Sequence, residues 1–129
     1  MKMTMNPADD PDGDDAEKWL TFCYTRAFQN EWKALGYSDV NLRKLEVALC
    51  RAPEAGAIIQ GAGGLRKMRW ALAWGGGKSG GCRIGYAYFS ALGRVLVVAI
   101  FAKADQANFT AAQKAQIKQV LQRYESESR

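Results

Sequence analysis

Three segments set the architecture of this chain: LRKMRWA (Leu65–Ala71), GCRIGYAYF (Gly81–Phe89) and RVLVVAIFA (Arg94–Ala102). Side chains of different character alternate along the first two, and the third is almost continuously apolar and rich in β-branched residues. The glycine-rich segment Gly75–Gly80 and the short segment Ser90–Gly93 separate them. Both separators are predicted to be turns, so the three segments are predicted to be neighbouring antiparallel strands.

Helices are expected before and after these strands in the sequence. The aromatic, β-prone segment Trp19–Tyr24 predicts a first strand, after which Thr25 and Ser38 are suited to cap two successive helices. Gly36 suits the end of the first helix, and Pro53 ends the second. A capping box of Thr110 and Gln113 predicts a last helix. The expected apolar stripes of the three helices are Phe28, Trp32 and Leu35; Leu42, Leu45, Leu49 and Ala52; and Ile117, Val120, Leu121 and Tyr124.

The order of elements predicts an α+β fold, a compact domain with an antiparallel β-sheet. An N-terminal helical hairpin and a C-terminal helix are expected to cover one face of this sheet. Residues 1–17 hold six acids against one lysine and few large apolar side chains, so they are expected to form an acidic disordered head. Residues 18–129 are expected to form the domain.

The charge of the chain is unevenly distributed. The head has a net charge of −5, whereas the other 112 residues have a net charge of +10. No acidic residue occurs between Glu54 and Asp105, although seven lysines and arginines do. Such a surface favours a polyanionic partner.

Other classes of protein are disfavoured by composition. The chain has no histidine, and Cys23, Cys50 and Cys82 form no CxxC pair, so neither a metal site nor any cofactor is expected. The longest apolar run, Val95–Ala102, is too short to cross a membrane, and the first residues lack the apolar run of a signal peptide. A cytoplasmic location without membrane contact is therefore expected.

Strand alternation predicts which side chains share a face. Lys67 and Arg69 alternate with Arg66, Met68 and Trp70, and Arg83 alternates with Ile84 and Tyr86. If the large apolar residues pack against the helices, Lys67, Arg69 and Arg83 lie together on the open face, where an extended nucleic-acid strand could bind. The alternative is a solvated face whose cations only keep the sheet soluble.

The glycine-rich turn holds two further candidates. Gly77-Lys78-Ser79 lacks the upstream glycine and the following helix of a P-loop, but Lys78 could still reach a phosphate as a mobile charge. Trp74 could stack on a base. The alternatives are a solvated turn for Lys78 and a place at the edge of the core for Trp74.

Three spaced motifs resemble one protein family. The motifs GGLRKMRWA (63–71), GKSGGCRIGYAYF (77–89) and FAKA (101–104) are similar to those of the RelE/HigB superfamily of bacterial type II toxins, and most to its HigB-like branch. The resemblance covers residues 18–124 and is strongest over 53–103. The acidic head departs from it, because members of the family begin almost directly with the first strand.

The resemblance implies a ribosome-dependent endoribonuclease that cleaves mRNA in the ribosomal A site. Its partners would be the ribosome, mRNA and a cognate antitoxin protein that forms a hetero-oligomer with it. Matched by motif, the catalytic residues would be Lys67, Arg69 and Arg83. The residues expected to bind RNA are Arg66, Lys78, Lys103 and Trp74. No general base carries over from the family.

Cleavage by a 2′-hydroxyl needs no metal, but it does need a proton acceptor and stabilisation of the developing charge. Without histidine, Lys67 is the candidate base, and Arg69 and Arg83 would hold the phosphoryl oxygens. The alternative function is a catalytically silent relative that only binds RNA or a protein.

Overall fold

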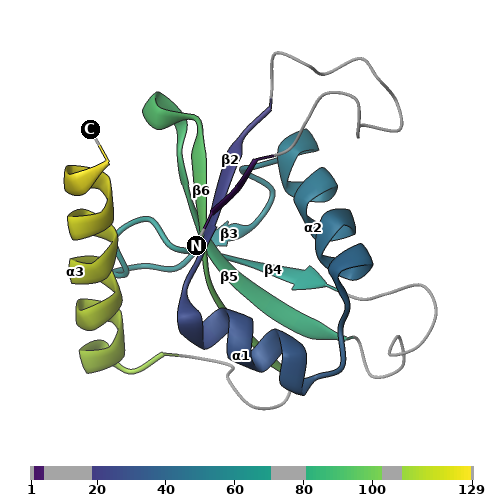
Figure 1. Ribbon diagram of the computed structural model, residues 1–129. Helices are drawn as coiled ribbons and strands as arrows, with labels where there is room; N and C mark the ends of the chain where they lie inside the picture. The colour runs from purple at the N-terminus through teal and green to yellow at the C-terminus, as the bar shows by residue number, and fades with distance from the viewer. Residues whose placement is uncertain (1, 5–18, 71–80, 103–108, 129) are drawn as a thin grey trace.

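The computed structural model describes residues 2–4, 19–70, 81–102 and 109–128 (Figure 1). The described elements are β1 (Lys2–Thr4), β2 (Thr21–Tyr24), α1 (Arg26–Ala34), α2 (Asp39–Arg51), β3 (Ala57–Ile58), β4 (Arg66–Trp70), β5 (Cys82–Phe89), η4 (Ser90–Leu92), β6 (Arg94–Ala102) and α3 (Ala111–Glu127). The predicted α+β class is confirmed. Residues 1–17 were expected to be a disordered acidic head, but Lys2–Thr4 form β1, which pairs with β2. The acid cluster of the head lies outside the described residues.

The described strands form one six-stranded sheet in the order β1-β2-β6-β5-β4-β3. The antiparallel meander of β4, β5 and β6 is confirmed, with Met68 opposite Ile84 and Ile84 opposite Ile100. The sheet is not wholly antiparallel, because β2 runs parallel to β6. Turn length predicts pairing between consecutive strands, but it cannot predict which edge a distant strand joins.

All three predicted helix caps are present. The side chains of Thr25, Ser38 and Thr110 accept hydrogen bonds from backbone N–H groups three residues later. Each cap satisfies a donor that has no partner within the helix. The local sequence therefore determines where these helices begin.

A large apolar core lies between the sheet and the helices α1 and α2. On the sheet side it buries Phe22, Ile84, Tyr86, Val95 and Val97, and on the helix side Phe28, Trp32, Leu45, Leu49 and Cys50. Tyr24, Phe28 and Trp32 stack in succession, with ring centroids 5.4 Å apart in each pair. Leu35 was expected in the apolar stripe of α1, but it is 43% exposed because it caps the end of the helix.

One carboxylate is buried in this core. Glu46 is only 1% exposed, and it accepts a hydrogen bond from Tyr24 Oη. Arg43 Nε lies 3.6 Å from Glu46 Oε1. Burial and the hydrogen bond to Glu46 raise the pKa of Tyr24 far above its ordinary value, so the phenol remains a donor. The pairing matters because an unpaired buried charge would be strongly destabilising.

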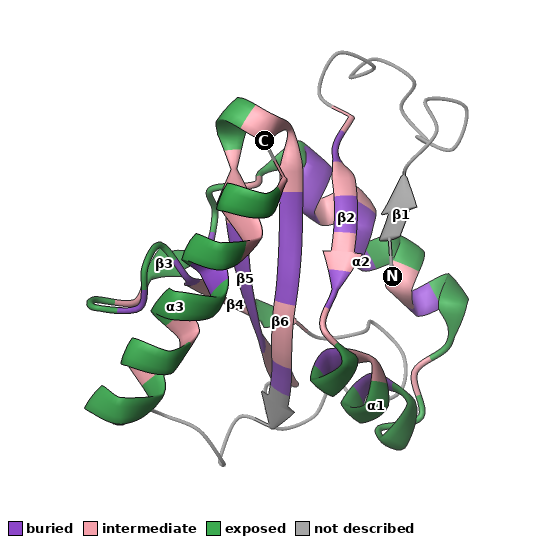
Figure 2. Cartoon of the chain, turned by 60° about the vertical axis from the view of Figure 1, so that its left-hand side comes forward, coloured by how far each residue is buried: buried purple, intermediate pink, exposed green. Residues whose placement is uncertain are grey.

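Helix α3 lies on the opposite face of the sheet from α1 and α2 (Figures 1 and 2), and a smaller core lies under it. This core buries Ala62, Leu65, Ala87, Leu96 and Leu121. The expectation that all helices cover one face is therefore wrong: α1 and α2 lie on one face and α3 on the other. The continuous apolar run of β6 is the signal for this arrangement, because a strand buried on both faces does not alternate. Val120, expected in the stripe of α3, is 46% exposed.

Candidate nucleic-acid interface

The pairing of β4 with β5 brings three cations together on the sheet face that α3 partly covers. Arg69 lies directly opposite Arg83, and Lys67 lies opposite Gly85, one step along the same face. Side chains directly opposite each other begin about 4.5–5.5 Å apart at Cβ. Lys67, Arg69 and Arg83, called the cation cluster below, can therefore converge on one anionic group.

Arg83 has an unsatisfied donor. Its Nη1 atom is buried and has no hydrogen-bond partner among the residues that the structure describes. A buried donor without a partner costs about 1–3 kcal/mol, and more when it is charged. An anion that reached this atom would supply the missing acceptor, so the unpartnered Nη1 atom is consistent with a ligand in the cluster.

The strands around the cluster carry no acid. Every residue from Ala55 to Ala104 is neutral or basic, and this range includes β4, β5 and β6. Like charges placed opposite each other on a sheet are mutually destabilising. A phosphate at Arg69 and Arg83 would offset this repulsion, as a bidentate guanidinium contact does.

Arg66, expected to bind RNA, lies on the other face of β4. Its Nη1 atom donates to the carbonyl oxygens of Glu54 at 3.0 Å and Gly56 at 2.9 Å. These bonds tie the segment before β3 to the sheet. The guanidinium is thus engaged by the backbone and is not brought together with the cation cluster.

Tyr86 also points away from the cluster. Its Oη atom accepts a hydrogen bond from the backbone N–H of Gly56 at 2.9 Å, and burial raises the pKa of its phenol. A Cβ at Gly56 would come within 2.9 Å of this oxygen and 3.1 Å of the Lys67 carbonyl oxygen, so the close approach requires glycine. Tyr86 therefore stabilises the fold and is not part of the candidate site.

Lys67 opens into a cavity of about 350 Å³ between β3, the segment after it and the start of α3. The cavity, called the Lys67 cavity below, is lined by Ala57, Ile58, Ile59, Gln60, Lys67, Phe109 and Lys114. Neither β3 nor a role for Lys114 was expected from the sequence. The spacing of Lys114, Ile117, Lys118 and Leu121 was an available signal, because it places the two lysines on the same side of α3 as the buried Leu121.

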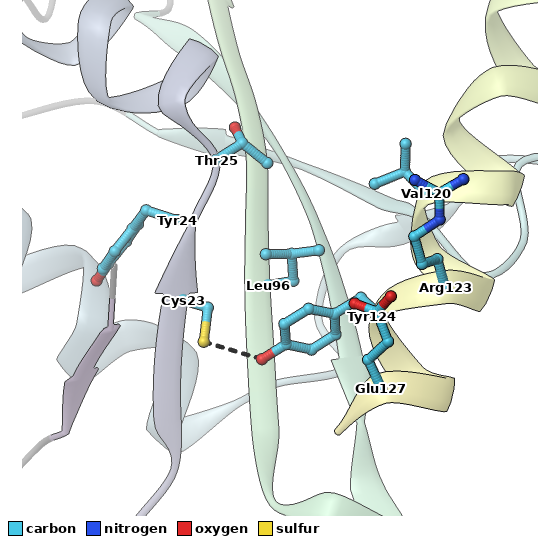
Figure 3. Close-up of a pocket in the computed structure, with 8 residues that line it drawn as sticks. All are labelled: Cys23, Tyr24, Thr25, Leu96, Val120, Arg123, Tyr124 and Glu127. Atoms are coloured by element: carbon cyan, nitrogen blue, oxygen red, sulfur yellow. Dashed lines mark hydrogen bonds between the residues drawn. The ribbon is translucent and has the colours of Figure 1, made fainter. Parts of the chain in front are cut away.

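The other end of α3 covers a second cavity, of about 380 Å³ (Figure 3). Tyr124 reaches from α3 toward β2, where its Oη atom donates to Cys23 Sγ at 2.9 Å. Burial raises the pKa of Tyr124, and the bond to Cys23 acts in the same direction. This contact anchors the end of α3 on the sheet.

Three expected RNA-binding residues, Lys78, Lys103 and Trp74, lie outside the described residues. Among the residues that are described, no group of three histidine, cysteine or acidic side chains could hold a metal ion. No helix within the same ranges is long and apolar enough to span a bilayer.

No protein-family model matches the sequence. Among solved structures, the chain is similar to the toxin RelE of E. coli, determined as a double arginine-to-alanine mutant in the free state. The two chains are 21% identical, and their superposition has a TM-score of 0.48 over 78% of this chain and 94% of RelE.

Proposed function

We propose that this protein is the toxin of a type II toxin–antitoxin system, an endoribonuclease that cleaves mRNA in the ribosomal A site. The observation that carries the proposal is the cation cluster, with Arg69 opposite Arg83 on an acid-free sheet face. The buried, unpartnered Nη1 atom of Arg83 supports it. The three sequence motifs that resemble the RelE/HigB superfamily, most closely its HigB-like branch, narrow the choice among RNA-binding functions.

The proposed reaction is a transesterification. The 2′-hydroxyl of one nucleotide attacks the adjacent phosphorus, a new P–O2′ bond forms, and the P–O5′ bond to the next nucleotide breaks. Arg69 and Arg83 stabilise the charge that develops on the phosphoryl oxygens, because guanidinium groups bind such oxygens in pairs. Lys67 takes the proton from the 2′-hydroxyl in its neutral amine form and becomes the ammonium ion, and the leaving 5′-oxygen receives a proton from solvent.

The proposed substrate and partners are consistent with the limited catalytic power of Lys67, Arg69 and Arg83. The chain has no histidine, so it lacks the residue that most often transfers protons at neutral pH. Positioning of the mRNA by the ribosome would compensate for the missing histidine, because correct orientation alone can lower an activation barrier by several kcal/mol. A cognate antitoxin would silence the enzyme in the cytoplasm, and Lys78, Lys103 and Trp74 would add contacts to RNA.

The direct test is cleavage of mRNA on translating ribosomes. The purified protein should produce cuts in the A-site codon, mapped by primer extension, and leave the same mRNA intact without ribosomes. Uncut mRNA in both reactions would exclude the nuclease.

A catalytically silent RNA-binding module is the second candidate. The position of Tyr86 favours it, because this phenol faces away from the cation cluster and cannot transfer a proton there. Binding of single-stranded RNA without cleavage on ribosomes would select this function. The affinity of the protein for single-stranded RNA should fall with salt, with a slope of about −2 to −3.5 in log affinity against log salt concentration if about three to five phosphates are bound.

A further inference from the structure

The Lys67 cavity is lined by apolar side chains, a side-chain amide and two lysines. Ile58, which is 56% exposed, gives it an apolar surface together with Ile59 and Phe109. Gln60 brings a side-chain amide that can both donate and accept hydrogen bonds. Lys67 and Lys114 add two positive charges. Apolar walls with a few polar groups are typical of small-ligand sites, and about 350 Å³ is within their usual range.

The walls of the cavity are held in place by contacts outside it. The backbone N–H of Ile59 donates to the Leu65 carbonyl at 2.9 Å, and that of Ala62 donates to the Ile59 carbonyl at 3.3 Å. Gly63 has a φ of 72° and packs against Lys118 of α3, where a Cβ would come within 3.0 Å of the lysine Cα. The segment that carries Ile58 and Gln60 is thus fixed against α3, and a ligand would enter a preformed site.

Lys67 belongs both to this cavity and to the cation cluster. It lies opposite Gly85, while the neighbouring pair on the same face is Arg69 and Arg83. A phosphate held by the two arginines would therefore have the cavity beside it, because residues two apart in a strand lie on the same face about 6–7 Å from each other. The two lysines and the absence of acids from residues 55–104 favour an anionic ligand over a peptide.

We propose that the Lys67 cavity binds one base of single-stranded RNA, next to the phosphate held by Arg69 and Arg83. The inference rests on the proposed function and adds a base-binding subsite to it. The base packs against Ile58 and Phe109, the Gln60 amide hydrogen-bonds its edge, and Lys114 contacts the adjoining phosphate. Burial against aromatic and apolar side chains accommodates any base, because every base has a flat face.

The test compares two fluorescent hexamers in anisotropy titrations at 50 mM salt. Both have a ribose-phosphate backbone of abasic positions, and one carries a single adenosine. The protein should bind the adenosine hexamer about fivefold to a hundredfold more tightly, the range expected for one base against an aromatic surface. If it binds both hexamers equally, the base subsite is excluded while the phosphate-binding face stands. If it binds neither hexamer, nor an unmodified RNA hexamer, the proposed function fails as well.

Matched variants locate the base. Ile58→Ser and Gln60→Ala should each lower the preference for adenosine at least threefold. Their controls are Val40→Ser, at a 66% exposed position on α2, and Gln122→Ala on the exposed side of α3, and both should keep the preference. Lys114→Ala should weaken both hexamers alike and reduce the salt slope by about 0.7, the contribution of one phosphate on a single strand. An unchanged preference in Ile58→Ser and Gln60→Ala would overturn the assignment.

Discussion

The two faces of the sheet are built from different side chains. Against α1 and α2, β4 and β5 present Met68, Trp70, Ile84 and Tyr86, which pack into the larger core. Their other face carries the cation cluster. The helices follow the same contrast, because α2 buries five residues whereas α3 buries only Leu121. In Figure 2, most of α3 has the colour of exposed residues.

Within a single strand, side chains that stabilise the fold therefore alternate with side chains that can bind a ligand. Alternation allows a five-residue strand such as β4 to contribute to the core with one set of side chains and to a ligand site with the other. The cation cluster then opposes folding, through repulsion between like charges and through the unsatisfied Nη1 atom of Arg83. Such local conflicts are expected at functional sites and are offset elsewhere, here by the core under α1 and α2.

Truncation of a core leucine should show the largest effect on stability. Leu45→Ala and Leu121→Ala should both lower the free energy of unfolding by about 2–5 kcal/mol, since each removes a fully buried side chain. Leu45→Ala should cost more, because Leu45 lies in the larger cluster and leaves a cavity that closes less easily. Urea denaturation followed by tryptophan fluorescence measures both values. A greater loss of unfolding free energy in Leu121→Ala than in Leu45→Ala would contradict the conclusion that the core under α1 and α2 contributes most to stability.

Arg83→Ala should have the largest effect on activity. Loss of a guanidinium that binds the phosphoryl oxygens should raise the barrier by about 2–4 kcal/mol, a thirtyfold to thousandfold slower cleavage on ribosomes. The free energy of unfolding should stay the same or rise, because an unpartnered buried donor is removed. Arg26→Ala, at an exposed position in α1, is the control and should cleave at the parent rate. Full activity of Arg83→Ala would argue against catalysis by the cluster.

Tyr86→Phe should affect stability and leave cleavage unchanged. The variant leaves the buried N–H of Gly56 without its acceptor, at a cost of about 1–3 kcal/mol in the free energy of unfolding. Its phenol faces away from the cation cluster, so the cleavage rate of the folded variant should equal that of the parent. A rate loss greater than tenfold, with melting well above the assay temperature, would assign Tyr86 to the reaction.

The smallest effect should appear at high pH. Burial, and then the hydrogen bond to Cys82, raise the pKa of Tyr37 to about 12 from 10.0. Because the pKa is higher in the folded state, the stabilisation is fully present below pH 10 and is lost as the pH rises from 10 to 12. Comparison of the parent protein with Tyr37→Phe in urea at pH 9 to 12 isolates this contribution. A parent protein whose advantage over Tyr37→Phe grows with pH would contradict the direction of the shift.

Local features of the sequence were sufficient for much of the fold. The caps at Thr25, Ser38 and Thr110 and the meander of β4, β5 and β6 depend on residues close together in the chain. The alternation of β4 and β5 placed Lys67, Arg69 and Arg83 on a common face for the same reason. Their catalytic role stays a prediction.

The remaining features depend on contacts between distant segments. Nothing local to β2 indicates that it lies parallel to β6, and nothing local to α3 indicates which face it covers. Arg66 looks like Lys67 in the sequence, but carbonyl groups ten and twelve residues away occupy its guanidinium. The Lys67 cavity exists only where β3 meets α3, more than 50 residues later in the chain. Periodicity and capping act within a few residues and can be inferred from composition and spacing, whereas cavities and charge partners arise only when packing brings remote segments together.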